Sequence, residues 1–199
     1  MILLVGLIGG LIFGLALALL QKRSWQLPAL RSIWLVILAF LPQMVAFYIP
    51  ATRREIPDLI AATCLILSQV FLLVFCWLNR RVAGMWLLAL GLGLNLLVIA
   101  LNGGFMPISP QTASRLIPEA VLAKQQIGSR FGWGKDLLLL PERTRLLGLS
   151  DRFLPPIWFP YQVAFSFGDI LVALGAFWLM LTQGEPFRLA KNKLLKDIR

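Results

Sequence analysis

The stretch Leu101-Asn102-Gly103-Gly104-Phe105-Met106-Pro107 closes a long apolar run and opens the longest polar segment of the chain. Its counterpart, Ser166-Phe167-Gly168-Asp169, lies where the last apolar run begins. The segment between them is too polar for hydrocarbon, which offers no partners for backbone and charged groups. The two motifs therefore predict a helical membrane bundle with one folded lobe outside the membrane, residues 102–160, which we call the lid.

Composition places the chain in the membrane class. Of its 199 residues, 59% are hydrophobic and 14% are charged, and the mean hydropathy is +0.81. A soluble domain carries about 25% charged residues. A helix needs roughly 20 apolar residues to cross about 30 Å of hydrocarbon. The apolar runs predict an all-α protein of one domain with five membrane spans, at residues 2–20, 32–49, 58–78, 83–101 and 161–182.

The basic residues predict the orientation of this bundle. The net charge is +10, but Lys and Arg beside apolar runs set membrane topology and do not by themselves indicate nucleic acid. With the N-terminus outside, the inner segments carry Lys22, Arg23, Arg31, Arg80, Arg81, Arg188, Lys191, Lys193, Lys196 and Arg199. The same inner ends carry Trp25, Trp34, Trp77, Trp86 and Trp178, as an interfacial belt would. We therefore expect an outside N-terminus, a cytoplasmic C-terminus and an extracytoplasmic lid.

Two further segments have their own signals. In the lid, Ser109-Pro110 predicts a short helix over 110–117, and Pro118 begins a second one that Gly128 ends. At the C-terminus, residues 185–199 place apolar residues at helical spacing, with the basic residues mostly on the other side. This pattern is typical of an amphipathic helix on a membrane surface, and its charge predicts contact with anionic lipid. A solvated basic tail is the alternative.

Small residues form one face of the first span. Gly6, Gly10 and Gly14 recur every four residues, and Ala18 continues the series. Such a face lets a second helix backbone approach closely. It predicts helix packing and leaves open whether the partner is internal or another membrane protein.

The outer half of the predicted bundle contains a candidate polar pocket, made of Gln43, Gln69, Asn95, Asn102, Gln162, Ser166 and Asp169. Because the fourth and fifth spans run antiparallel through the lid, Asn95 is expected at the depth of Asp169. An acid inside a span is costly unless paired, so Asp169 is a functional hypothesis. Two structural alternatives remain: Asp169 links helices by hydrogen bonds, or the helix starts near Ser166 with Asp169 in its first turn.

The chain lacks residues that many enzymes need. It has no histidine, the commonest metal ligand and the usual general base. Cys64 and Cys76 lie about 18 Å apart along a helix, too far to bridge. The lid acids show no pairing that the sequence reveals: Glu119, Asp136, Glu142 and Asp151. We therefore expect no catalytic residue, metal or cofactor, and no nucleic-acid partner.

Three motifs carry a resemblance to a known family. They are Asn-Gly-Gly-x-Met-Pro at 102–107, Leu147-Gly148-x-x-Asp151 with Pro155 beyond it, and Ser166-x-Gly168-Asp169. Together they resemble bacterial membrane proteins grouped as domain of unknown function 5317. The likeness covers about residues 80–182, and the first three spans are similar only in hydrophobic layout. The resemblance implies a five-span protein of the bacterial cytoplasmic (inner) membrane and no known activity.

These observations favour a non-enzymatic multi-pass membrane protein that packs against other membrane proteins as an accessory or scaffold component. The glycine face and the missing catalytic sets carry this expectation. The alternative is a carrier or receptor that binds a small ligand or ion in the pocket around Asp169. A third hypothesis, an enzyme of lipid or cell-envelope chemistry, has the least support.

Overall fold

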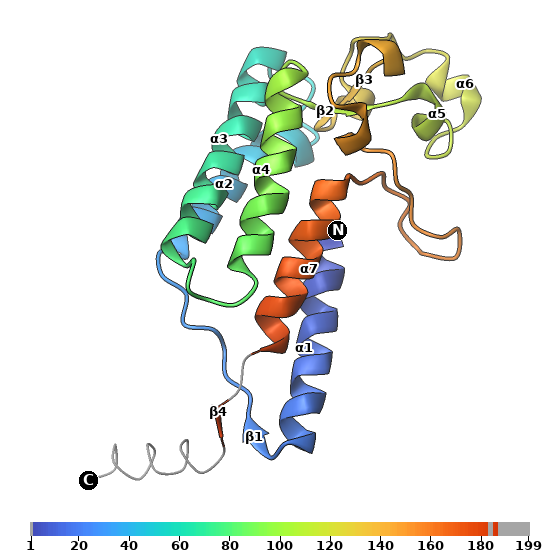
Figure 1. Ribbon diagram of the computed structural model, residues 1–199. Coiled ribbons are helices and arrows are strands. Elements are labelled where there is room, and N and C mark those ends of the chain that lie inside the picture. Colours follow the sequence, from blue (N-terminus) through green and yellow to red (C-terminus); the bar gives the residue numbers. More distant parts are fainter. Residues whose placement is uncertain (1, 183–184, 187–199) are drawn as a thin grey trace.

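Five apolar helices make up most of the structure, a computed structural model that describes residues 2–182 and 185–186 (Figure 1). They are α1 (Ile2–Leu20), α2 (Trp34–Gln43) with its π-helical continuation η1 (Met44–Tyr48), α3 (Asp58–Leu78), α4 (Met85–Leu101) and α7 (Phe167–Leu181). By length and composition, α1 and α3 suffice to cross a membrane. Trp34–Tyr48, α4 and α7 are apolar but shorter. The mainly helical class is confirmed.

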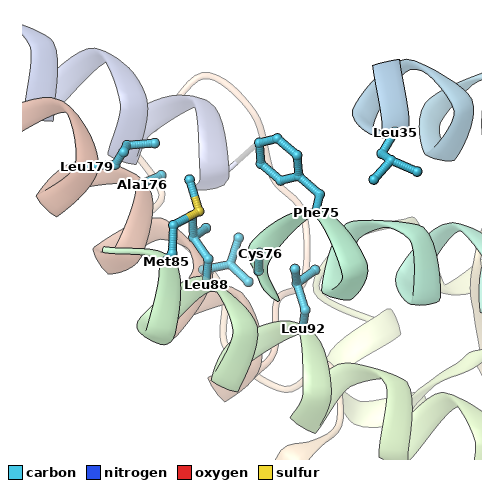
Figure 2. Close-up of a cluster of buried hydrophobic side chains, with 9 residues drawn as sticks. Leu35, Phe75, Cys76, Met85, Leu88, Leu92, Ala176 and Leu179 are labelled. Carbon is cyan, nitrogen blue, oxygen red and sulfur yellow. The ribbon is translucent and has the colours of Figure 1, made fainter. Parts of the chain in front are cut away.

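The last helix among the described residues, α7, lies between the first helix and the fourth apolar run. α7 packs against α1 on one side and α4 on the other, and the row continues from α4 to α3 and from α3 to α2 (Figure 1). α7 thus separates the first helix from the other three. In the half of the bundle away from the lid, four helices contribute to an apolar cluster, shown in Figure 2: Leu35, Phe75, Cys76, Met85, Leu88, Leu92, Ala176 and Leu179.

The helix bounds follow the apolar runs closely except in two places. α1 and α3 begin and end where predicted, and α4 begins two residues inside its run. Pro42 lies within α2, and the helix continues beyond it as the wider turn of η1. Proline has no N–H to donate and its ring crowds the preceding turn, which a local π-helical turn accommodates.

The predicted start of the fifth helix, residue 161, was wrong. α7 begins at Phe167, because Ser166 is its N-cap in an extended conformation. The Ser166 Oγ accepts a hydrogen bond from the Asp169 N–H (3.0 Å), and the Asp169 Oδ2 accepts one from the Ser166 N–H (3.1 Å). This capping box satisfies two backbone donors at the helix end. Phe165 pairs instead with Phe153 in the lid, so residues 161–165 extend the lid beyond its predicted end at residue 160.

The prediction of an all-helical lid also needs correction. The lid is organised around two parallel strands, β2 (Met106–Ile108) and β3 (Asp136–Leu138), with Ile108 additionally bridged to Asp151. The connection between the strands carries the two expected helices, both shorter than predicted, α5 (Pro110–Ala113) and α6 (Glu119–Leu122). Single 3-10 turns complete the lid at Phe131–Trp133, Pro141–Arg143 and Leu147–Leu149. Strands of three residues are too short to show an alternating pattern.

The Asn-Gly-Gly stretch fixes the lid to the bundle. The Asn102 side chain donates to the Arg145 carbonyl (2.9 Å) and accepts from the Arg145 N–H (2.9 Å). Gly104 has φ +88°, and a Cβ there would overlap the side chain of Ala62 on α3. Phe105 and Met106 then enter an apolar cluster with α3 and α4. The lid is therefore packed on the helices and is not a free loop.

A buried arginine makes a second attachment. Arg130, only 5% exposed, lies 3.0 Å through its Nε from the Asp58 Oδ1 at the start of α3. Its Nη2 also donates to the Arg53 carbonyl at 2.8 Å. The lid is thus linked to the turn between η1 and α3 as well as to α4.

At the pole of the bundle opposite the lid, the segment that follows α1 meets the segment that follows α7 (Figure 1). β1 (Arg23–Ser24) pairs antiparallel with β4 (Glu185–Pro186). Residues 187–199, and with them nearly all of the predicted amphipathic helix 185–199, lie outside the described residues.

Candidate functional site

A polar network joins α4 to the start of α7. The Asn95 Nδ2 donates to the Asp169 Oδ1 at 2.8 Å, and the Ser166 Oγ donates to the Asn95 Oδ1 at 2.8 Å. Both Asp169 oxygens therefore accept a hydrogen bond, since the other one receives the Ser166 N–H of the capping box. The expected contact between Asn95 and Asp169 is confirmed, and so is the alternative that places Asp169 in the first helical turn.

Two glycines make this network possible. A Cβ on Gly91 would lie 2.5 Å from the Gly168 carbonyl oxygen, and a Cβ on Gly168 would overlap the Asn95 amide. The backbones of α4 and α7 therefore touch at this level. The short distance lets the Asn95 side chain reach across to both Ser166 and Asp169.

The other four residues of the predicted pocket have different partners. Asn102 binds the lid backbone at Arg145. Gln162 is exposed and donates to two carbonyls of its own loop, because α7 starts after it. Gln43 on α2 donates a hydrogen bond to the Ser68 hydroxyl on α3. Gln69 directly follows Ser68 on α3. The structure thus brings together Asn95, Ser166 and Asp169, and the single pocket of seven residues was too broad.

A second polar cluster lies in the lid, and the sequence analysis did not find it. The Lys135 Nζ lies 3.4 Å from the Asp151 Oδ2 and 3.8 Å from the Asp136 Oδ1. The Asp151 side chain is fully buried, whereas that of Lys135 is 40% exposed. Ile108 brings the acids together, because β2 pairs with β3 and Ile108 also bridges to Asp151. This contact depends on strand register, which no local pattern revealed.

Burial controls the charge of this cluster. It raises the pKa of Asp151 well above the usual carboxyl range, with Lys135 opposing the shift and Asp136 and Asp169 adding to it. Burial also raises the pKa of Asp136, again against Lys135. Burial acts to lower the pKa of Lys135, but Asp151, Asp136 and Asp169 together raise it, so the ammonium stays charged. The cluster therefore combines a fixed cation with two carboxyls that hold protons unusually well.

A cavity of about 350 Å³ connects the two polar groups. Its charged lining residues are Lys135 from the lid and Asp169 from α7, and Tyr48 of η1 adds a phenol. The remaining lining is apolar and comes from α1, the lid and α7: Ile2, Leu3, Val163, Ala164, Phe165 and Val172. Small-molecule sites commonly have such a volume and a few polar groups among apolar walls.

The two cavity-lining residues Lys135 and Asp169 differ in their direct contacts. The Lys135 Nζ lies within 4 Å of carboxyl oxygens of both Asp136 and Asp151. Asp169 accepts hydrogen bonds from neutral donors, and over residues 2–182 it has no ion pair within 4 Å. The cavity therefore contains one carboxylate without a cationic partner in direct contact. Within the same residues, no group of three or more Cys, Asp or Glu side chains is arranged to hold a metal ion.

Comparison with known proteins points to one family. The model of a family of unknown function, DUF5317, matches residues 28–181, a range that includes α2, α3, α4, the lid and α7. An uncharacterized protein of Thermotoga maritima is 34% identical over 113 residues, 56% of this chain and 58% of the relative. The match thus spans less than two thirds of the relative's length. No solved structure matches the chain.

Proposed function

The chain belongs to DUF5317, a family of unknown function, and we propose that it is a non-enzymatic multi-pass membrane protein that binds a small organic cation in the cavity between lid and bundle. The observation that carries this proposal is the Asp169 carboxylate, which lines the cavity without a direct ionic partner among residues 2–182. An ammonium group in the cavity would supply that partner. The apolar walls would contact a short hydrocarbon portion of the same ligand.

Exposed apolar surface supports the membrane part of the proposal. Only 17% of the most apolar 18-residue window of α1 is buried, and 33% of that of α3. A core helix of a soluble protein would be covered. Leaving such surfaces in water costs about 25 cal/mol per Å², so a hydrocarbon environment is favoured. In this proposal α1, α2 with η1, α3, α4 and α7 all cross the membrane.

Charge and tryptophan placement support the orientation. The pole opposite the lid carries Lys22, Arg23, Arg31, Arg80 and Arg81 in short connections, as cytoplasmic segments do. Trp34, Trp77, Trp86 and Trp178 are more than half exposed on the bundle surface, as an interfacial belt would be. We therefore propose that the lid is extracytoplasmic and, with the family resemblance, that the membrane is the bacterial cytoplasmic one.

The accessory or scaffold role loses one of the two features that motivated it, the glycine face of α1. Gly6, Gly10 and Gly14 are buried against α7, and a Cβ on Gly14 would lie 2.6 Å from the Met180 carbonyl oxygen. The small-residue face of α1 therefore packs inside this chain. A role through contact with other membrane proteins stays a prediction, as does the binding of anionic lipid by residues 185–199.

Binding of n-butylammonium to the purified protein tests the cation proposal. We expect this probe to raise the melting temperature of the parent in a concentration-dependent way, by mass action. Asp169→Asn keeps the shape of the side chain and one of its two accepted hydrogen bonds but removes its charge, so the shift should disappear. Glu119→Gln, which removes an exposed lid carboxylate, should leave the shift intact.

Two results would contradict the proposal: no thermal shift for the parent, or equal shifts for the parent and Asp169→Asn. The melting temperature of Asp169→Asn without ligand separates loss of binding from loss of fold. Native mass spectrometry of the gently extracted parent gives a second readout, because a bound small mass should be absent from the variant.

A further inference from the structure

An apolar groove runs between α3 and α4 at the pole opposite the lid. Its volume is about 340 Å³, and its lining is Leu73, Val74, Cys76, Trp77, Arg80, Met85, Trp86 and Ala89. The rings of Trp77 and Trp86 meet edge to face, with centroids 6.2 Å apart. Arg80 is the charged residue of the lining. In the proposed orientation this groove opens toward the inner leaflet, and its mostly apolar lining suits a hydrocarbon chain.

A basic cavity adjoins the groove. It has a volume of about 370 Å³ and is lined by Ala29, Arg31, Leu78, Asn79, Arg80, Arg81 and Val82. Arg80 lines both spaces. Its guanidinium lies 4.8 Å from the centroid of the Trp77 ring, and its Nη1 donates to the Trp77 carbonyl at 3.2 Å. The polar and apolar cavities are therefore two parts of one continuous surface.

The side chain of Asn79 holds together the two segments that line this basic cavity. Its side chain is almost fully buried, and its Oδ1 accepts a hydrogen bond from the Arg31 N–H at 2.7 Å. Its Nδ2 donates to the carbonyls of Arg31 (3.0 Å) and Phe75 (2.9 Å). One amide thus holds the segment before α2 against the end of α3. As a result, Arg31 comes next to Arg80 and Arg81, from which it is separated by 48 residues or more.

The three arginines have no acidic partner in this arrangement. The lining contains no carboxylate, and among the side chains that the structure describes none of the three forms an ion pair within 4 Å. Three arginines that line one cavity without a carboxylate give it a positive charge that an anion would neutralise. Guanidinium is also the side chain that best matches the geometry of phosphate oxygens.

We propose that this surface binds one anionic phospholipid of the inner leaflet. The headgroup phosphate lies among Arg31, Arg80 and Arg81, and one acyl chain runs along Trp77 and Trp86. Basic pockets at the cytoplasmic side of membrane helices are a common way to recognise anionic headgroups. The site differs in its residues from the basic C-terminal segment and from the Asp169 cavity. It depends on the proposed membrane embedding but not on cation binding at the lid.

Native mass spectrometry of the purified protein with added lipid tests this site and avoids any effect of the substitutions on membrane insertion. We expect one phosphatidylglycerol to bind in preference to phosphatidylcholine with the same acyl chains. The triple variant Arg31→Gln, Arg80→Gln, Arg81→Gln should bind phosphatidylglycerol roughly tenfold more weakly or worse. Lys22→Gln with Arg23→Gln removes two charges at the same pole outside both cavities and should keep the parent's affinity.

Two further variants and competitors separate the parts of the site. Trp86→Ala should weaken the binding of phosphatidylglycerol while leaving the arginines in place, because it removes part of the acyl groove. Inorganic phosphate in excess should fail to displace the lipid, since it fills only the basic cavity. Equal binding of the two lipids, equal losses in the triple variant and the Lys22/Arg23 control, or displacement by phosphate alone would overturn the proposal.

Discussion

The two sides of α7 are closed in different ways. Toward α1, the described contacts are those of close apolar packing. The glycines at 6, 10 and 14 let the α7 backbone approach, and Phe13 packs against Phe177 with ring centroids 5.9 Å apart. Toward α4, glycines come from both helices, Gly84 and Gly91 on one and Gly168 and Gly175 on the other. Only this second interface also carries the polar network of Asn95, Ser166 and Asp169.

The two interfaces show that two properties of a helix pair have different causes: how closely the backbones approach, and how the helices are aligned along their length. A row of glycines permits backbone contact, but neighbouring positions along the row are alike. Hydrogen bonds between membrane helices average only about 0.6 kcal/mol, so the network adds little stability. It does, however, define one register, because Asn95 meets Asp169 at one position only, as buried polar residues do in other helix pairs. Because this network holds Asp169, which lines the lid cavity, the alignment of α4 with α7 matters for the candidate site.

The largest effect is expected at the α4 interface. A Cβ on Gly175 would lie 2.6 Å from the backbone nitrogen of Leu88 on α4, so Gly175→Ala forces two helices apart. We expect destabilisation of about 1–3 kcal/mol, as for other overpacked sites. Gly93→Ala is the matched control, because a Cβ there meets nothing within 4 Å and gains the same helix propensity. Thermal melting in detergent measures both variants, and equal melting temperatures would show that the backbones of α4 and α7 do not touch.

A smaller effect is expected at the α1 interface. A Cβ on Gly14 would lie 2.6 Å from the Met180 carbonyl oxygen, whereas one on Gly9 would be at ordinary contact distance from the Phe177 ring. Among the helices, α1 packs mainly on α7, so it can shift to relieve the strain. We expect Gly14→Ala to cost about 1 kcal/mol relative to Gly9→Ala. If Gly14→Ala proved more damaging than Gly175→Ala, the comparison between the two interfaces would be reversed.

The sequence predicts what depends on length and spacing along one helix. The ends of α1 and α3 and the packing face of Gly6, Gly10 and Gly14 were visible as apolar runs and a four-residue repeat. The partner of that face was not, because it is a helix more than 150 residues later. The meeting of Asn95 with Asp169 could be predicted because the connection through the lid makes α4 and α7 antiparallel.

The remainder depends on tertiary structure. The start of α7 was misplaced because the mostly apolar residues 161–165 extend the run, although Ser166 and Asp169 have the spacing of a capping box. Lys135 and Asp151 are brought together because β2 pairs with β3 and Ile108 bridges to Asp151. Strands this short leave no pattern in the sequence from which the pairing could be predicted. The basic cavity at the other pole likewise depends on tertiary contacts, because the buried Asn79 amide holds the segment before α2 at Arg31.

The smallest expected effect concerns pH, and it sharpens the comparison because two acids with a raised pKa lie in the lid, whereas α1 carries no titratable side chain over Ile2–Leu20. Burial raises the pKa of Asp151 and of Asp136 in the folded protein. An acid with a raised pKa binds its proton more tightly in the folded than in the unfolded state. Between the usual carboxyl pKa, about 3.9, and the raised value, the stability of the lid therefore falls as pH rises. We expect slower hydrogen exchange in β2 and β3 at pH 5 than at pH 8, after correction for intrinsic rates.

The same experiment contains its own reference, since the amides of α1 should show no such change. Asp151→Asn replaces the buried acid by a group that stays neutral, and the pH dependence of β2 and β3 should become shallower. Glu142→Gln, which removes an exposed carboxylate of the same lid, should leave it as in the parent. An equal slope in α1 and the lid would mean that pH acts on the whole fold. A parent lid that exchanges more slowly at pH 8 would mean that Lys135 outweighs burial and that Asp151 is ionised there.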